Sequence, residues 1–178
     1  MNEIYAKSIL YAYPCLEALI EQIDDLVLGL AIASMDNYKS CLTQCNAIIS
    51  LTEQKDDVIQ LKLVCDDIFS KGFTPYEYDC LDYRYFRKQP KEYYETFDVF
   101  SRKYFRNQIH IVKKFARKLK YRGITDEWFE NTLLKIDFFK ELVHRVETRK
   151  EPSFERAEFV EGRVYHYDED FEEEKLSA

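Results

Sequence analysis

The chain has 178 residues, 46% of them hydrophobic and 33% charged, a composition typical of a globular protein with one domain or two small helical ones. Its 4 Gly and 4 Pro are too few for the many turns of an all-β protein, and the sequence has no run of about 18 apolar residues that could span a membrane. The net charge of −7 by itself argues against a nucleic-acid partner. The charges are unevenly distributed, however: residues 84–122 carry 13 Lys and Arg against 3 Asp and Glu, so this block can attract a phosphate backbone.

The cysteines indicate a reducing compartment, because their number, 5, is odd and no two are spaced as in a CxxC pair. Cys41 and Cys45 share one helix face, but a zinc site would need two further ligands close by. We therefore expect buried, reduced thiols and no metal or other cofactor. The N-terminus lacks the basic segment and cleavage site of a secretory signal, so a cytoplasmic location without membrane attachment is expected.

Residues 1–70 are expected to form a helical hairpin. Apolar side chains recur at steps of three and four residues in 1–33 and again in 40–70, and Pro14 is expected to start the first main helix or to kink a longer one. The two stripes can pack against each other within one chain, which is the favoured interpretation, or they can supply the coiled-coil-like seam of a homodimer or another partner. The stripes comprise Leu16, Leu19, Ile20, Ile23, Leu26, Val27 and Leu30, then Leu42, Cys45, Ile48, Ile49, Val58, Ile59, Leu63 and Ile68.

Residues 71–148 are expected to form a helix-turn-helix bundle. Gly72 suits the end of the preceding helix, and Thr74, Pro75 and Glu77 make a capping box that starts a new helix. That helix is predicted to run to about residue 87, with Cys80, Leu81 and Tyr85 facing inward, and a short helix is predicted at about 90–97.

Ser101 is expected to cap a third, longer helix that Gly123 stops. Its expected buried stripe consists of Phe105, Ile109 or Gln108, Val112, Phe115 or Ala116, and Leu119. Thr125 is expected to cap a last helix over 126–148, whose apolar face comprises Trp128, Phe129, Leu133, Ile136, Phe139, Leu142 and Val143.

The order of these helices is that of a helix-turn-helix unit, in which the last helix enters the major groove of double-stranded DNA. Arg and Asn suit bidentate contacts with guanine and adenine, and Lys suits contact with phosphates. We favour this interpretation over a merely solvated basic helix; RNA is an alternative ligand, because aromatic side chains interleave the charges. The residues expected to contact DNA are Arg102, Lys103, Arg106, Asn107 and His110, then Lys113, Lys114 and Arg117, and before this helix Arg84, Arg87 and Lys88.

An ordered set of short pieces runs over about 50 residues: Phe73-Thr74-x-x-Glu77, Leu81-x-x-Arg84-Tyr85-Phe86, Lys91-Glu92, Ser101 before a basic helix, and Lys118-Leu119. This set resembles the region 4 helix-turn-helix of sigma-70-type RNA polymerase sigma factors. The resemblance implies a sequence-specific or promoter-associated transcriptional regulator of the kind that phages and mobile elements of Gram-positive bacteria encode. It also implies RNA polymerase as a partner, and it places Arg102, Lys103, Arg106 and Asn107 against the DNA.

The end of the chain is expected to be an acidic tail, because residues 151–178 carry 10 acidic and 3 basic residues. Within it, 156–167 alternate as in a small β-hairpin, and the acids are expected to shield the basic block or to contact polymerase. The sequence contains no Gly-rich phosphate loop and no recognised catalytic motif, so no enzymatic activity is expected. The alternative function is an all-α protein–protein interaction module, whose basic face meets an acidic protein and which has no DNA target.

Overall fold

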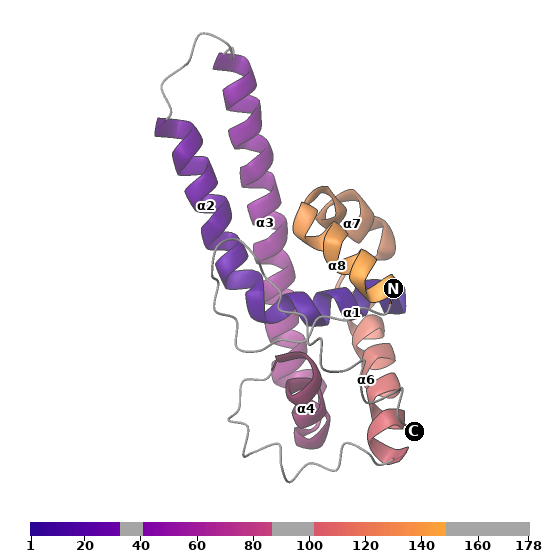
Figure 1. Ribbon diagram of the computed structural model, residues 1–178. Helices are drawn as coiled ribbons and strands as arrows, with labels where there is room; N and C mark the ends of the chain where they lie inside the picture. Colours follow the sequence, from indigo (N-terminus) through magenta and orange to yellow (C-terminus); the bar gives the residue numbers. More distant parts are fainter. Residues whose placement is uncertain (33–40, 87–101, 149–178) are drawn as a thin grey trace, which may run out of the picture.

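The computed structural model describes residues 1–32, 41–86 and 102–148, and these ranges consist of helices joined by short turns, with no strand among them (Figure 1). The all-α prediction is therefore confirmed for the described part of the chain. The short helix predicted at 90–97, the cap predicted at Ser101 and the hairpin and acidic run predicted after residue 149 lie outside it. The elements are α1 (Glu3–Ala12), η1 (Tyr13–Cys15), α2 (Leu16–Ile32), α3 (Cys41–Gly72), α4 (Pro75–Leu81), η2 (Asp82–Phe86), α6 (Arg102–Tyr121), α7 (Asp126–Asn131), η3 (Leu133–Lys135) and α8 (Asp137–Glu147).

The helices α2 and α3 lie side by side as an antiparallel hairpin that projects from the rest of the molecule (Figure 1). Ion pairs cross the hairpin, with Lys55 Nζ 2.6 Å from Asp24 Oδ1 and Lys62 Nζ 3.1 Å from Glu17 Oε1. A helical hairpin is therefore present as predicted, but it consists of α2 and α3, and α1 is not part of it. None of the helices in the described part of the chain combines the length and the apolar character that a bilayer crossing requires.

The predicted apolar stripes are buried only near the base of this hairpin. There Leu16, Leu19 and Ile23 of α2 and Val58 and Ile68 of α3 are buried. The prediction was wrong for the residues that face away from the other helix of the hairpin, because the described residues cover each helix there on one side only. Exposed members of the predicted stripes are Leu26, Leu42, Cys45, Ile49 and Leu63, and Cys41 is exposed as well.

Pro14 marks the predicted break in the first helical region. It lies in η1, which separates α1 from α2, and the two helices point in different directions (Figure 1). The hydroxyl of Tyr13 donates to Asp66 Oδ1 of α3 at 2.7 Å, and the Tyr13 ring packs edge-on against Phe69 at 4.6 Å. These contacts fix the corner, and α1 continues from it to pack against α6 and α8.

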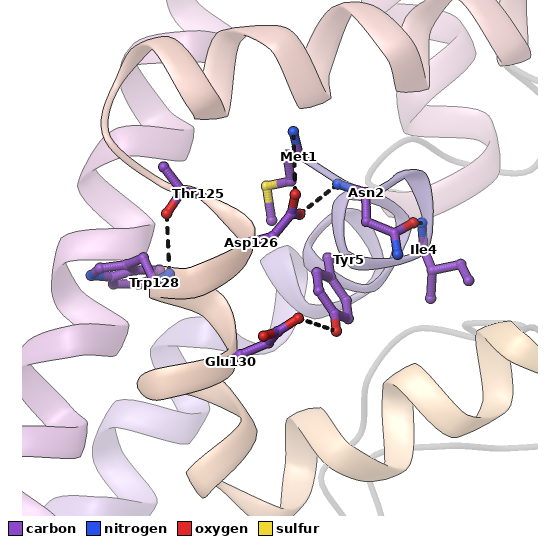
Figure 2. Close-up of polar contacts among 8 residues, drawn as sticks. All are labelled: Met1, Asn2, Ile4, Tyr5, Thr125, Asp126, Trp128 and Glu130. Atoms are coloured by element: carbon purple, nitrogen blue, oxygen red, sulfur yellow. Dashed lines mark hydrogen bonds and ion pairs between the residues drawn. The ribbon is translucent and has the colours of Figure 1, made fainter.

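The first helix is held against α7 by polar and aromatic contacts (Figure 2). The Asn2 N–H donates to Asp126 Oδ1 at 2.6 Å, and the Tyr5 hydroxyl donates to Glu130 Oε1 at 2.9 Å. The ring of Tyr5 stacks on Phe129, with centroids 4.4 Å apart. One hydrophobic core therefore runs from α1 through α3 and α6 to α8.

The last helical region is broken in two. Thr125 caps α7 as predicted, since its hydroxyl accepts the Trp128 N–H at 3.1 Å, but the helix ends at Asn131 rather than near residue 148. The turn η3 and an extended Ile136 follow before α8 begins. The break turns the chain so that Phe129 and Phe139 both reach the core, with ring centroids 6.0 Å apart.

Candidate nucleic-acid interface

The capping box predicted at the start of α4 is present in the structure. The Thr74 N–H donates to Glu77 Oε2 at 2.8 Å, and the Glu77 N–H donates to the Thr74 hydroxyl at 3.3 Å. Pro75 is the first helical residue, where its missing N–H costs no hydrogen bond. This local geometry fixes where α4 begins relative to the end of α3.

Contacts with α4 hold α6 in place. Lys114 Nζ lies 2.7 Å from the capping oxygen Glu77 Oε2 and 5.1 Å from the centre of the Phe73 ring. Nearer the start of α6, the Gln108 side-chain amide donates to the Cys80 carbonyl of α4 at 2.9 Å. The basic helix is thus seated on the first helix of the predicted unit, although the segment between the two helices is outside the described residues.

One face of α6 is buried in the core. Phe115 stacks on Phe69 of α3 with ring centroids 5.3 Å apart and an interplanar angle of 8°. The expected burial of Val112, Phe115, Ala116 and Leu119 is confirmed, whereas Phe105 and Ile109 were wrongly placed inside, since they are 58% and 57% exposed. At the start of α6 the buried row passes through Tyr104 instead, which shifts the inward face by one residue. The buried residues of α6 are Tyr104, Ile111, Val112, Phe115, Ala116 and Leu119.

The opposite face of α6 carries a row of exposed basic side chains, which we call the cationic row. Its members follow one another at steps of three and four residues, so they lie along one side of the helix over about 26 Å. Among the described residues, Arg106, Arg117 and Lys120 form no ion pair, and Lys113 Nζ lies 3.7 Å from Glu3 Oε1. The row consists of Lys103, Arg106, His110, Lys113, Arg117 and Lys120.

The structure brings most of the predicted contact residues onto or beside this row, but not all. Asn107 is half-buried at its edge, and Lys114 is engaged with Glu77 rather than projecting freely. Arg84 is exposed on η2, close to Tyr104 at the start of α6. Arg87, Lys88 and the side chain of Arg102 lie outside the described residues.

An open groove of about 500 Å³ lies between the end of α3 and the second half of α6. Asp67 pairs there with Lys71, at 3.0 Å, and with Arg122. The hydrogen bond from Lys71, together with the charge of Arg122, lowers the pKa of Asp67. The last carbonyls of α3 carry partial negative charge, which also attracts cations to this place. The basic side chains that line the groove are Lys71, Lys114, Arg117, Lys118 and Arg122.

Gly72 lies where the groove is narrow, and its backbone is not left-handed. A Cβ atom on Gly72 would lie 3.1 Å from both Cδ and Cε of Lys118, which crosses the end of α3 at this point. The left-handed glycine is Gly123, with φ of 89°, where the Ile124 N–H donates to the Leu119 carbonyl and the Gly123 N–H to that of Lys120. The stop predicted at Gly123 is confirmed.

Sequence reasoning missed Asp67, Lys71, Tyr121 and Arg122 as parts of this surface. Asp67 and Arg122 lie far apart along the chain, so no local pattern joins them. The glycine of Lys71-Gly72 is the local signal that could have indicated a close approach by a second element, which the structure shows to be Lys118 of α6.

In the described part of the chain, no group of three or more His, Cys, Asp or Glu is arranged to hold a metal ion. Comparisons of the chain with models of protein families, with curated proteins and with solved structures give no match. The geometry of α6 and its surroundings is therefore the basis on which a function is argued.

Proposed function

We propose that this protein is a DNA-binding transcriptional regulator that resembles sigma factor region 4 and places α6 in the major groove of double-stranded DNA. The observation that carries this proposal is the cationic row of α6, which lies opposite a buried apolar face. A helix that reads DNA needs one face held rigidly by the protein and the other free to meet phosphates and base edges. A solvated basic helix needs neither a continuous row nor a second set of cations beside it.

The two halves of α6 have different tasks in this proposal. Arg106 and Asn107 lie in the first half, and their guanidinium and amide groups suit hydrogen bonds to base edges. Lys113, Arg117 and Lys120 lie in the second half and contact phosphates. Of these, Arg117 also lines the groove with Lys71 and Arg122. RNA polymerase is a second proposed partner, on the strength of the resemblance alone.

The test is fluorescence anisotropy with labelled duplex DNA of mixed sequence at several salt concentrations. The variant Arg106→Ala/Arg117→Ala removes two exposed cations of the row that have no described ion-pair partner. Each lost phosphate contact should reduce the slope of log affinity against log salt by about 0.9. We expect weaker binding and a slope shallower by about 0.9, because Arg117 is the phosphate contact of the two and Arg106 is the base contact.

The control variant Lys135→Ala/Lys140→Ala removes the same charge from η3 and α8, away from α6. It should leave the salt slope unchanged. Equal losses in the two variants would show that net charge alone drives binding, and no binding of the native chain at low salt would reject the proposal. Equal affinity for single-stranded RNA of the same length would favour the RNA alternative.

A specific observation favours the second candidate, an interaction module for an acidic protein. Phe105 and Ile109 are exposed one turn apart beside the cationic row, and large apolar side chains are enriched where proteins bind one another. The variant Phe105→Ser/Ile109→Ser decides between the two. Loss of a nuclease-resistant protein partner with unchanged DNA binding would favour the interaction module.

A further inference from the structure

The outer face of α3 carries a second regular row, unrelated to the DNA-binding proposal. Its members follow one another at alternating steps of three and four residues, which is the spacing of the a and d positions of a coiled coil. It lies on the side of α3 opposite to Val58, Leu61 and Cys65, which are buried. The row, which we call the α3 seam, consists of Leu42, Cys45, Ile49, Thr52, Asp56, Ile59 and Leu63.

Five of the seven residues of the α3 seam are apolar, and six of the seven are exposed. Leu42 is 70% exposed, Ile49 is 55% exposed and Leu63 is 64% exposed, and no residue of the stretch 41–52 is charged or fully buried. The seam covers three heptads, the length from which such a pattern predicts a coiled coil. An apolar row of this length on a projecting hairpin is unusual for a surface that meets only water.

We propose that the α3 seam pairs with the α3 seam of a second copy of this chain in an antiparallel arrangement. A two-fold axis brings the same face of both copies together, so the face must complement itself. Residues 41–52 of α3 carry no charge, so the part of the second copy that lies opposite them meets no like charge.

The single charge in the seam selects the antiparallel direction. A parallel pair would place Asp56 against Asp56 of the second copy, and two carboxylates in close contact repel each other. An antiparallel pair with its axis near residue 54 places Thr52 opposite Asp56 of the second copy, so that the polar residues meet at the centre. Ile49 then faces Ile59 of the second copy, and Cys45 faces Leu63, which gives apolar layers on both sides.

The first test measures the mass of the full-length chain in solution, by light scattering and sedimentation equilibrium, at protein concentrations up to about 100 μM. We expect a dimer for the native chain and a monomer for Ile49→Glu. Leu28→Glu is the matched control. Leu28 is 57% exposed, close to the 55% of Ile49, and lies on the same hairpin, but it belongs to α2 and not to the seam. It should leave the dimer intact, and circular dichroism should show the same helicity for both variants.

A native chain that stays monomeric over this range, or a dimer that survives Ile49→Glu, would overturn the proposal. A dimer that Leu28→Glu disrupts to the same extent as Ile49→Glu would also overturn it, because the contact would then not follow the seam. None of these measurements includes DNA, so their result is independent of the proposed function.

The second test fixes the direction by thiol oxidation of Cys41→Ser and of Cys41→Ser/Leu63→Cys. The other cysteines, Cys15, Cys65 and Cys80, are buried. In the antiparallel pair Cys45 faces position 63 of the second copy, so only the double variant should give covalent dimers on treatment with oxidised glutathione. Covalent dimers from Cys41→Ser alone would place Cys45 against Cys45 and overturn the antiparallel arrangement.

Discussion

Glu77 caps α4 and, through the same carboxylate oxygen, holds Lys114 of α6 at 2.7 Å. The side chains are 15% and 24% exposed, so the pair lies largely out of water and is worth more than a surface ion pair. Lys114 therefore positions the basic helix, and its charge is largely balanced before any ligand arrives. Of the cations of α6, we therefore expect Lys114 to contribute more to the stability of the fold than to the binding of a ligand.

We expect Glu77→Gln to destabilise the fold by about 1–2 kcal/mol at neutral pH, because a cap and an ion pair are weakened together. Burial raises the pKa of Glu77, but the hydrogen bonds from Lys114 and Thr74 outweigh it, so the pKa is lowered overall. A carboxyl whose pKa is lowered by folding stabilises the folded state at pH values above its pKa in the unfolded chain, about 4.3. This contribution is lost as the pH falls through the pKa of the folded state. Urea denaturation should show that the difference in free energy of unfolding between the native protein and Glu77→Gln becomes smaller below about pH 4.

The control for this prediction is Glu21→Gln, which changes an exposed carboxylate on α2. It should alter stability by less than about 0.5 kcal/mol at either pH. A gap between native protein and Glu77→Gln that stays constant from neutral to acidic pH would mean that the Glu77 charge is not the source of the effect.

The features that the sequence predicts well are those made by residues within five positions of one another. The box of Thr74 and Glu77, the cap of Thr125 and the stop at Gly123 each depend on short backbone hydrogen bonds. Residue type alone is enough to specify such bonds, because they form wherever the local backbone conformation allows them.

The misplaced residues share a different physical cause. Phe105 and Ile109 stand in line with Val112 and Ala116 on α6, so periodicity assigns all of them to one buried row. Such a row is buried only where a neighbouring helix packs against it. The periodicity of one helix carries no information about where its neighbours begin and end. On α3 two apolar rows, one buried and one facing outward, merge into a single apparent stripe for the same reason.

Two glycine-to-alanine changes should have opposite effects on stability. Gly29 lies within α2 with no atom near an added Cβ, so Gly29→Ala should stabilise the fold by up to about 1 kcal/mol through better helix propensity. Gly123 has a φ of 89°, which alanine adopts only with strain, so Gly123→Ala should destabilise it by about 1–2 kcal/mol. Thermal unfolding should show the melting temperature rising for the first variant and falling for the second. A fall in both would indicate that α2 makes a close contact at Gly29.

The register of α6 can be tested with one chemical change at two positions of the same helix. Phe115 is fully buried and stacks on Phe69, so Phe115→Ala should cost about 3–5 kcal/mol. Phe105 is 58% exposed, so Phe105→Ala should cost less than about 1 kcal/mol. The measurement is the free energy of unfolding in urea for the native chain and both variants. Comparable losses would place Phe105 in the core and rotate the cationic row away from solvent, whereas a large difference would leave Phe105 available to a binding partner.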